Sequence, residues 1–283
     1  MTLTAATRVA GVIGDPVRHS LSPVLHNAAY AELGIDWVYV AFEVHSDGTR
    51  AALEAMRALG IAGLSVTMPH KTAAASWCDE LSPDAAALRS VNTISLGDRG
   101  RLAGDSTDGE GFLRSLRDAG HDPAGAAAVL LGAGGAARAV ARALGCAGAH
   151  VVVCARKPEA AEVAAQLAQG SSRPWAERAR LAAEATIVVN ATPIGMAAGP
   201  SSAEVPVPLD ALHAGQTVAD LVYHPLDTPL LRGARERGAA VVDGLGMLVH
   251  QAGLQVERWT GGTAPIAAMR AAAEHALGTD PPA

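Results

Sequence analysis

Apolar runs of strand length alternate with segments of helical spacing through the first part of the chain. The apolar runs cover residues 8–13, 37–44 and 60–64, and the helical patterns cover residues 24–33 and 49–59. Short continuous apolar runs are typical of strands buried on both faces, whereas apolar residues three and four apart are typical of amphipathic helices. Strands and helices that alternate at this spacing predict an α/β fold with a parallel sheet.

The same alternation returns further along the chain. Strands are predicted at residues 90–94, 126–131, 150–154, 186–190, 217–221 and 239–242, and helices at 72–78, 111–119, 135–144, 229–237, 243–260 and 265–277. A proline-rich stretch at 200–208 is interpreted as an irregular connection, and the last residues are expected to fray. Composition alone places the clearest domain boundary at DPAG, residues 122–125.

The composition of the 283-residue chain narrows the class of protein. This length exceeds the commonest single-domain size, so two domains are expected. Apolar residues make up 49% and charged residues 18%, which is typical of a globular protein, and the net charge of −6 gives no reason to expect nucleic acid as a partner. No apolar run reaches the roughly 20 residues of a membrane helix, and no N-terminal signal pattern is seen.

Cysteine and histidine spacing bear on redox compartment and metal binding. The three cysteines, Cys78, Cys146 and Cys154, show no paired spacing, which favours reduced thiols in a cytoplasmic protein. The ten histidines show no spacing typical of metal ligands. We therefore expect no metal.

A glycine-rich turn follows the strand predicted at residues 126–131. Its sequence, GAGGAA (132–137), fits G-x-G-x-x-A and leads into a helix. The first glycine permits a tight turn, the second lets the backbone approach a pyrophosphate, and the small Ala137 lets the helix pack closely on the strand. In this strand–turn–helix context the motif predicts a dinucleotide site rather than a plain turn.

The end of the next strand, residues 150–154, indicates which dinucleotide is used. A site for NAD would carry an acidic residue here to bind the ribose 2′-hydroxyl. This chain instead has Cys154, Ala155, Arg156 and Lys157. Two cations without a carboxylate favour a 2′-phosphate, which arginine can bind with two hydrogen bonds. The sequence therefore predicts NADP.

Lys71 occupies an unusual place for a surface lysine. It follows SVTMPH (65–70) and precedes a segment of helix-forming composition. Proline suits the first turn of a helix, so Lys71 is expected in that turn, where the helix dipole disfavours a cation. Such a position suits a proton-transfer role. From these residues alone, a solvated lysine that follows a turn is still the better interpretation.

Several polar residues at predicted strand and helix ends have both structural and functional interpretations. Ser20 and Ser22 lie two apart in an extended segment, so their hydroxyls should point the same way. Ser22 precedes Pro23 and fits a helix N-cap, whereas Ser20 has no comparable structural role. Asn92 alone fits a turn residue.

Asp108, Tyr223 and Gln251 are also ambiguous. Thr107 and Glu110 fit a capping box, which leaves Asp108 free for another role at the start of a helix. A tyrosine after a strand, such as Tyr223, is more often structural than ligand-binding. Gln251 borders an apolar helical stripe and should therefore point towards packing rather than water.

Taken together, seven motifs resemble the shikimate dehydrogenase family, with its quinate and aminoshikimate relatives. They span nearly the whole chain: GDPVRHSLSP (14–23), SVTMPHK (65–71), SVNT (90–93), GDSTDG (104–109), GAGGAA (132–137), NATPIGM (190–196) and DGLGMLVHQA (243–252). The resemblance implies an α/β fold of two domains. An N-terminal substrate-binding domain, residues 1–107, would be completed by C-terminal helices, residues 245–283, and a Rossmann-type NADP-binding domain, residues 108–244, would be inserted.

The same resemblance implies reversible hydride transfer between NADPH and the ring ketone of 3-dehydroshikimate, which gives shikimate. Lys71 and Asp108 match the catalytic pair of the family. The positions that match substrate contacts are Ser20, Ser22, Thr67, Asn92, Tyr223 and Gln251. The positions expected at the cofactor are Gly132, Ala133, Gly134, Gly135, Ala136, Arg156, Lys157, Thr192, Leu221 and Gly244.

Three positions depart from the pattern of many family members, which have Asn at position 65, Phe or Gly at 70, and Asn at 106. This chain has Ser65, His70 and Ser106. Ser65 and His70 support the alternative that the substrate is quinate or aminoshikimate. A catalytically silent NADP-binding protein is a further alternative, and a monomer or a homodimer is expected.

Overall fold

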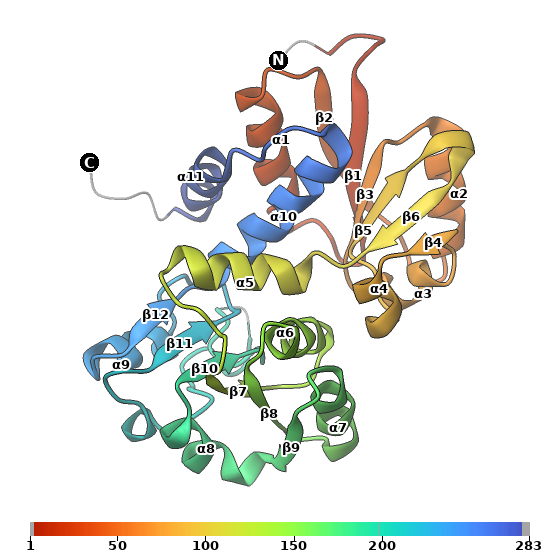
Figure 1. Ribbon diagram of the computed structural model, residues 1–283. Coiled ribbons are helices and arrows are strands. Elements are labelled where there is room, and N and C mark those ends of the chain that lie inside the picture. Colours follow the sequence, from red (N-terminus) through yellow and green to blue (C-terminus); the bar gives the residue numbers. More distant parts are fainter. Residues whose placement is uncertain (1–2, 198, 279–283) are drawn as a thin grey trace. The chain divides into compact units, whose positions relative to one another are not determined.

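The computed structural model describes residues 3–197 and 199–278, and the chain forms two compact units (Figure 1). The first unit combines Met1–Thr107 with Gln251–Ala283, and the second is Asp108–His250. The break expected at 122–125 from composition is wrong. Helix α5 (Asp108–Asp118) precedes those residues, yet its Phe112 and Leu116 are buried in the core of the second unit.

The second break lies six residues beyond the one expected at 244/245. Helix α10 (Gly244–Thr260) begins in the second unit and ends in the first. Its first residues pack closely on α5, because a Cβ atom at Gly246 would clash with the Ser115 hydroxyl. One turn later His250 Nε2 lies 3.0 Å from Asp118 Oδ2. These contacts explain why residues 245–250 belong with the second unit.

A six-stranded sheet, in the order β2-β1-β3-β5-β6-β4, forms the centre of the first unit. Its strands are β1 (Arg8–Gly14), β2 (Trp37–Glu43), β3 (Gly63–Val66), β4 (Glu80–Leu81), β5 (Thr93–Leu96) and β6 (Leu102–Asp105). The expectation of a parallel sheet is confirmed for β1, β2 and β3. It does not hold for β5, which runs antiparallel to both β3 and β6. The five residues between β5 and β6 are too few for the crossover that a parallel pair needs.

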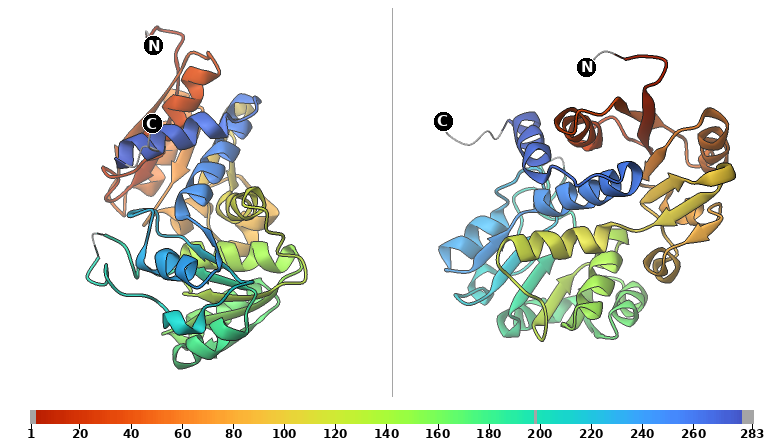
Figure 2. Two further views of the ribbon diagram at one scale, coloured as in Figure 1. Left: turned by 90° about the vertical axis from the view of Figure 1, so that its left-hand side faces the viewer. Right: turned by 45° about the horizontal axis from the view of Figure 1, so that its top comes forward.

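Helices cover both faces of this sheet. They are α1 (Ser22–Glu32), α2 (Thr49–Leu59), α3 (Lys71–Ala75), α4 (Pro83–Leu88) and α11 (Ile266–Leu277), with the end of α10. The core beneath α2, α3 and α4 contains Leu53, Met56 and Ile94. On the other side α11 packs against α1 (Figure 2). Close approach of α10 requires glycine at position 63, where a Cβ atom would clash with the Trp259 ring.

The second unit contains a fully parallel sheet in the order β12-β11-β10-β7-β8-β9. Its strands are β7 (Ala127–Leu131), β8 (His150–Ala155), β9 (Ser171–Pro174), β10 (Ile187–Asn190), β11 (Thr217–Asp220) and β12 (Ala240–Val242). This is the strand order of a Rossmann fold, and its direction reverses between β7 and β10. The expected second domain of this type is therefore present.

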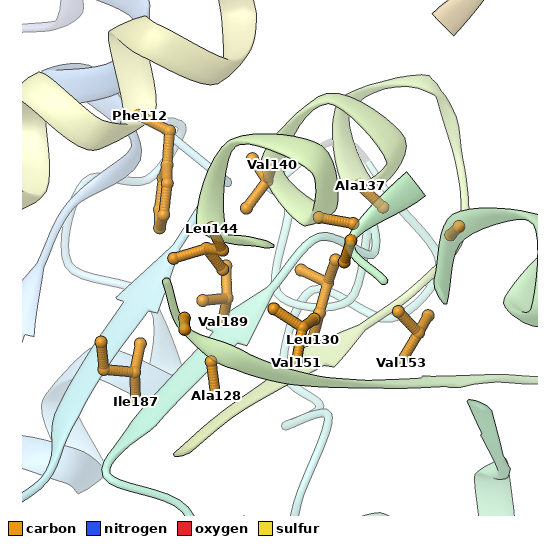
Figure 3. Close-up of a cluster of buried hydrophobic side chains, with 14 of the residues drawn as sticks. Phe112, Ala128, Leu130, Ala137, Val140, Leu144, Val151, Val153, Ile187 and Val189 are labelled. Carbon is orange, nitrogen blue, oxygen red and sulfur yellow. The ribbon is translucent and has the colours of Figure 1, made fainter. Parts of the chain in front are cut away.

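Alternating side chains of β7 enter two separate cores. Ala128 and Leu130 pack beneath α5, α6 (Gly135–Cys146) and α7 (Pro158–Leu167), as Figure 3 shows. Val129 and Leu131 pack on the other face, against α8 (Arg178–Glu184) and α9 (Pro229–Glu236). The all-apolar strand predicted from the sequence is thus buried on both faces, as parallel strands are.

Some short elements were not predicted from the sequence, namely β4, β6, β9, α4 and α8. About seven residues were expected in α3, which has five. Residues 279–283, where fraying was expected, lie outside the described part of the chain. No helix in residues 3–197 and 199–278 is long and apolar enough to cross a membrane.

Candidate functional site

One edge of the first sheet gathers the segments that carry the predicted substrate residues. At this edge Ile13 of β1 pairs with Val66 of β3, at the carboxyl ends of both strands. Thr93, the first residue of β5, pairs with Ser65 of β3 and with Asp105, the last residue of β6. The segments that leave β1, β3 and β6, and the one that enters β5, therefore lie together. They carry Ser20, Ser22, Thr67, Lys71, Asn92 and Thr107.

Lys71 opens α3, so its expected place in a first helical turn is confirmed. The turn before it contains a cis peptide bond between Met68 and Pro69. The Lys71 carbonyl accepts a hydrogen bond of 3.0 Å from the Val91 N–H, next to Asn92. The backbone thereby fixes the start of α3 beside the entry to β5.

The side chain of His70 supports this turn from inside. The ring is fully buried, and its Nε2 lies 2.8 Å from the Val44 carbonyl, which can only accept a hydrogen bond. Nε2 therefore carries a proton, and Nδ1 forms a hydrogen bond of 2.7 Å with the Thr49 hydroxyl. Because both ring nitrogens are bound by protein groups, His70 has a structural role and gives no support for an altered substrate.

The roles expected of Ser20 and Ser22 are partly reversed. Helix α1 begins at Ser22 itself, and its N-cap residue, Leu21, provides no side-chain cap. Instead the Ser20 hydroxyl accepts a hydrogen bond of 3.2 Å from the Ser22 N–H. Ser22 is therefore not the N-cap, and Ser20 does have a structural bond. The prediction that the two hydroxyls lie together is confirmed by their separation of 3.1 Å.

Asn92 is more than a turn residue. Its Oδ1 accepts hydrogen bonds of 2.8 Å from the Thr107 N–H and from the Thr93 hydroxyl. Its Nδ2 donates to the Thr107 hydroxyl at 2.9 Å. Asn92 thus ties the entry to β5 to the residue that directly precedes Asp108.

A buried polar cluster, which we call the Tyr39 cluster, extends from this edge. It comprises Tyr39, Ser65, Gln251 and Gln255, with Thr93 at its margin. The Tyr39 hydroxyl donates to Ser65 Oγ at 2.5 Å, and Ser65 donates to Gln255 Oε1 at 2.7 Å. Gln255 Nε2 lies 3.0 Å from Thr93 Oγ1 and 3.2 Å from Gln251 Oε1. Gln255 follows Gln251 by four residues on α10, a spacing that could have identified it in the sequence.

An aromatic stack lies beside the Tyr39 cluster. The His26 ring is stacked on Tyr39, with ring centres 4.0 Å apart, and on Trp259 at 5.5 Å. Complete burial lowers the pKa of His26 to about 4, so its imidazole is neutral at pH 7. His26 Nδ1 donates to the Ser22 carbonyl at 2.8 Å. Burial also raises the pKa of Tyr39, so this whole region is uncharged.

The glycine turn of the second unit has the geometry of an anion site. Gly132 has a φ of +111°, and a Cβ atom there would lie 2.7 Å from the Ala191 carbonyl. The N-cap residue of α6, Gly134, makes no side-chain cap, so the first N–H groups of α6 lack one. A Cβ atom at Gly134 or Gly135 would contact nothing within 4 Å. Exposed backbone donors at a helix N-terminus are suited to a phosphate.

The two cations predicted to bind a 2′-phosphate lie at the end of β8, in the same unit as the glycine turn. Arg156 and Lys157 directly follow the last residue of β8, and both side chains are exposed. Helix α7 begins at Pro158. In a Rossmann fold this strand end lies at the adenosine ribose. The residues present therefore fit a dinucleotide that carries a 2′-phosphate.

The remaining predicted cofactor residues lie at the ends of β10 and β11. Thr192 follows β10, and its hydroxyl donates to Asn190 Oδ1 at 2.7 Å. Leu221 follows β11, and its N–H donates to the Asn190 carbonyl at 2.9 Å. A Cβ atom at Gly244 would lie 2.6 Å from the Leu221 carbonyl, so only glycine fits this close approach. Tyr223 is partly exposed, and desolvation raises the pKa of its hydroxyl.

Two buried residues of this region were not identified as candidate functional residues from the sequence. Asn190 and Asp220 are at most 1% exposed and pair directly across β10 and β11. Burial raises the pKa of Asp220 to about 6, while hydrogen bonds from Val222, Thr228 and Asn190 act in the opposite direction. Asp220 could have been identified in the sequence, because it is an acidic residue at the end of the strand TVAD, which is otherwise largely apolar.

The predicted residues divide between the units. The first unit contains Ser20, Ser22, Thr67, Lys71, Asn92 and Gln251, whereas the second contains Asp108, Tyr223 and all ten cofactor positions. Asp108 is the first residue of α5. Because Lys71 and Asp108 belong to different units, their pairing stays a prediction. Within residues 3–197 and 199–278, no group of three or more His, Cys, Asp or Glu side chains is placed to hold a metal ion.

Comparison with known proteins agrees with the motifs along the whole chain. Residues 12–94 match the family described as shikimate dehydrogenase substrate binding domain, and residues 244–274 match shikimate 5′-dehydrogenase C-terminal domain. Residues 127–221 match NADP oxidoreductase coenzyme F420-dependent. The shikimate dehydrogenase (NADP(+)) of Moorella thermoacetica is 46% identical over 97% of this chain and 95% of its own length. The chain belongs to the shikimate dehydrogenase family.

Solved structures of the family have the same fold. Shikimate 5-dehydrogenase from Thermus thermophilus, in complex with NADP(H) and shikimate, has a TM-score of 0.88 and 36% identity over 95% of this chain and all (100%) of that chain. Quinate dehydrogenase from Corynebacterium glutamicum, in complex with NAD, has a TM-score of 0.89 and 30% identity over 95% of this chain and 99% of that chain. Family membership alone therefore does not distinguish between shikimate and quinate as the substrate.

Proposed function

We propose that this chain is an NADP-dependent enzyme that interconverts shikimate and 3-dehydroshikimate. The observation that carries the proposal is the set of hydroxyl, amide and ammonium groups at one edge of the first sheet, in a chain 46% identical to a shikimate dehydrogenase (NADP(+)). We also propose that the first unit binds the substrate and that the second binds NADP.

In the second unit, backbone N–H groups at the start of α6 would hold the pyrophosphate. Arg156, helped by Lys157, would bind the 2′-phosphate. Thr192, Leu221 and Gly244 would contact the nicotinamide side. When bound, NADP supplies the two-electron chemistry, because its nicotinamide ring gives or accepts a hydride.

Lys71 would handle the proton. As the ring ketone is reduced, its oxygen gains negative charge and needs a proton donor within hydrogen-bond reach. Lys71 Nζ gives this proton to the oxygen, and in the oxidation direction takes it from the substrate hydroxyl. The Asp108 carboxylate would accept hydrogen bonds from the Lys71 ammonium and from a substrate hydroxyl, which orients both groups.

The remaining polar groups would recognise the substrate ring. Neutral hydroxyl and amide groups suit a polyol, because a substrate that lacks a hydroxyl leaves a buried partner unpaired. The geometry of the first unit supports this role, since Asn92 and Gln251 are held by buried hydrogen bonds before any ligand arrives. The proposed contacts are Ser20, Ser22, Thr67, Asn92, Tyr223 and Gln251.

Quinate is the second candidate substrate, favoured by the similarity to quinate dehydrogenase from Corynebacterium glutamicum. Of the two residues that first suggested it, only Ser65 still bears on the choice, because His70 is bound within the fold. The hydroxyl of Ser65 is bound by Tyr39 and Gln255, so it would act on the substrate through the Tyr39 cluster.

Steady-state kinetics with purified protein test the proposal. We expect kcat/KM for oxidation of shikimate with NADP⁺ to exceed the values for quinate with NADP⁺ and for shikimate with NAD⁺. A higher value for quinate would favour the second candidate. Binding of NADP⁺ without turnover of either substrate would contradict both and would indicate a catalytically silent protein.

We further propose a cytoplasmic location, where thiols stay reduced. Cys78, Cys146 and Cys154 are all free, and burial raises the pKa of Cys78 to about 11. Such a thiol is almost wholly protonated at pH 7 and hence unreactive. Fractionation of cells that express the chain would test the location, and recovery outside the cytoplasm would contradict it.

A further inference from the structure

Asn190 and Asp220 form a buried hydrogen-bonded pair between two loops of the second unit. They are the last residues of β10 and β11 and oppose each other in the parallel ladder. Asn190 Nδ2 donates to Asp220 Oδ1 at 2.8 Å. Each residue also binds the loop that follows its own strand, and those loops carry Thr192, Leu221 and Tyr223.

Asn190 fixes the loop after β10. Its Oδ1 accepts from the Thr192 N–H at 3.1 Å and from the Thr192 hydroxyl at 2.7 Å. Its Nδ2 donates to the Ile194 carbonyl at 3.1 Å, and the Ile194 N–H donates to Thr192 Oγ1 at 3.2 Å. The conformation of Thr192 therefore depends on one buried amide.

Asp220 fixes the loop after β11. One oxygen accepts from the Val222 N–H at 3.0 Å, and the other accepts from the Thr228 hydroxyl at 2.8 Å. Thr228 is the N-cap of α9, because its Oγ1 accepts from the Leu231 N–H at 3.2 Å. A backbone bond of 2.9 Å from Ala197 N–H to the His224 carbonyl joins the two loops directly.

A carboxylate at this place is costly for folding. Asp220 is 1% exposed, and its hydrogen-bond partners among the described residues are neutral donors rather than cations. Buried polar groups are often replaceable by apolar ones without loss of stability. Asp220 accepts hydrogen bonds from two loops and from the N-cap of a helix. Its presence is therefore better explained by a role in holding those loops in one arrangement than by a contribution to stability.

We propose that Asn190 and Asp220 are positioning residues that shape the nicotinamide half of the NADP site. The inference rests on the proposed function. In a Rossmann fold the two halves of a dinucleotide lie over the two halves of the sheet. The glycine turn and Arg156 belong to the half formed by β7, β8 and β9, whereas Asn190 and Asp220 belong to the half formed by β10, β11 and β12.

Ligand binding by an isosteric variant tests the proposal. In Asp220→Asn an amide nitrogen replaces one accepting oxygen, so either the Asn190 and Val222 donors or the Thr228 hydroxyl proton lose their acceptor, and the loops loosen. NADP⁺ and adenosine 2′,5′-bisphosphate, which has the 2′-phosphate but no nicotinamide, are compared by calorimetry. We expect the Kd of Asp220→Asn for NADP⁺ to rise roughly 10-fold, and the Kd for the bisphosphate to stay within about twofold.

Asp227→Asn is the matched control, because Asp227 lies near the same loop but is exposed and pairs only with Arg232 and Arg235 among the contacts described. It should leave both Kd values unchanged. Equal weakening of both ligands in Asp220→Asn, or of neither, would overturn the proposal. Failure of the wild-type chain to bind NADP⁺ would instead overturn the proposed function.

A second pair of variants, with smaller changes, tests the proposal if Asp220→Asn does not fold. Thr228→Val removes one donor to Asp220, whereas Thr228→Ser retains the hydroxyl. We expect the loss of NADP⁺ affinity in Thr228→Val, at unchanged bisphosphate affinity, to be restored in Thr228→Ser. Equal affinities of the two variants for NADP⁺ would contradict the positioning role.

Discussion

Each unit of this protein keeps a buried polar cluster near the edge of its sheet where the predicted site residues lie, but the two clusters differ in charge. The Tyr39 cluster of the first unit contains only neutral groups, and His26 beside it is neutral because burial lowers its pKa to about 4. The cluster of the second unit, formed by Asn190, Asp220 and Thr228, contains a carboxyl group whose pKa burial raises to about 6.

The difference matches what each unit is proposed to bind. Neutral hydrogen-bonding groups suit a polyol ring, which has no charge to balance at its hydroxyls. In the second unit the charge of the proposed ligand would be met by exposed groups, at the start of α6 and at Arg156. The buried carboxylate of Asp220 is instead proposed to hold the loops that follow β10 and β11. His26, beside the first cluster, and Asp220, in the second, should therefore make stability depend on pH in opposite directions, whereas the Tyr39 cluster itself should not titrate.

The largest expected effect is the loss of stability of the first unit in acid. The pKa of His26 is about 4 in the folded protein and 6.5 in the unfolded chain, so the unfolded chain binds more protons between these values. Stability is therefore full above pH 6.5 and is lost as pH falls to 4, by about 3 kcal/mol. Urea unfolding followed by tryptophan fluorescence, in a Trp175→Phe background that leaves only first-unit tryptophans, measures it.

His26→Gln is the control for this prediction, since glutamine can still donate to the Ser22 carbonyl but does not titrate. The difference in unfolding free energy between wild type and His26→Gln should shrink as pH falls from about 7 to about 4. A difference that stays constant with pH would show that His26 does not cause the acid effect.

A somewhat smaller effect of opposite sign is expected for Asp220. Its folded pKa of about 6 exceeds the unfolded value of 3.8, so the folded protein binds more protons between these values. The contribution of Asp220 to stability is therefore greatest below about pH 4 and falls by about 2–3 kcal/mol as pH rises to about 6. Comparing wild type with Asp220→Asn across this range isolates the effect. A difference that grows in favour of the wild type with rising pH would contradict it.

The third prediction concerns an exposed cation rather than a buried group. Arg156→Ala should lower kcat/KM for NADP⁺ roughly 10–100-fold, because a charged hydrogen bond to phosphate is lost. The value for NAD⁺ and the urea midpoint should stay unchanged, since the side chain is exposed. Lys157→Ala serves as the neighbouring control and should have a smaller effect. Equal losses with both cofactors in Arg156→Ala would argue against recognition of a 2′-phosphate.

The smallest effect is expected inside the Tyr39 cluster. Tyr39→Phe removes the hydroxyl that donates to Ser65 and should reduce the free energy of unfolding by about 1 kcal/mol. The loss should be independent of pH between about 5 and 8, because the burial-raised pKa of Tyr39 lies far above this range. Urea titrations at both pH values measure it, and a marked pH dependence would show that the cluster is not neutral.

The central strands and the glycine turn of the Rossmann unit were the easiest elements to predict from sequence, whereas its β9 and α8 were not predicted. Apolar runs such as residues 126–131 give continuous patterns because both faces are buried, and the turn at Gly132 requires a backbone conformation that glycine favours. These are local constraints, so local sequence reveals them. In the first unit, strands β4 and β6 were missed because they are short and partly polar.

The buried polar contacts could not be predicted for a different reason. Asp220 and Asn190 lie 30 residues apart, and Ser65 and Gln255 lie 190 apart. Such pairs meet only after the sheets have formed, and a single polar residue at a strand end leaves no periodic pattern. Ser22 shows a local limit too, because Ser before Pro fits an N-cap, yet α1 begins one residue earlier than that signature implies.

The rate of NADPH formation shows whether Lys71 transfers the proton in an NADP-dependent oxidation of shikimate. The wild type and Lys71→Ala are compared with saturating shikimate and NADP⁺. We expect turnover by the wild type and a kcat lower by roughly 10²–10⁴-fold in Lys71→Ala, with little change in KM. Comparable kcat values for the two proteins would contradict it.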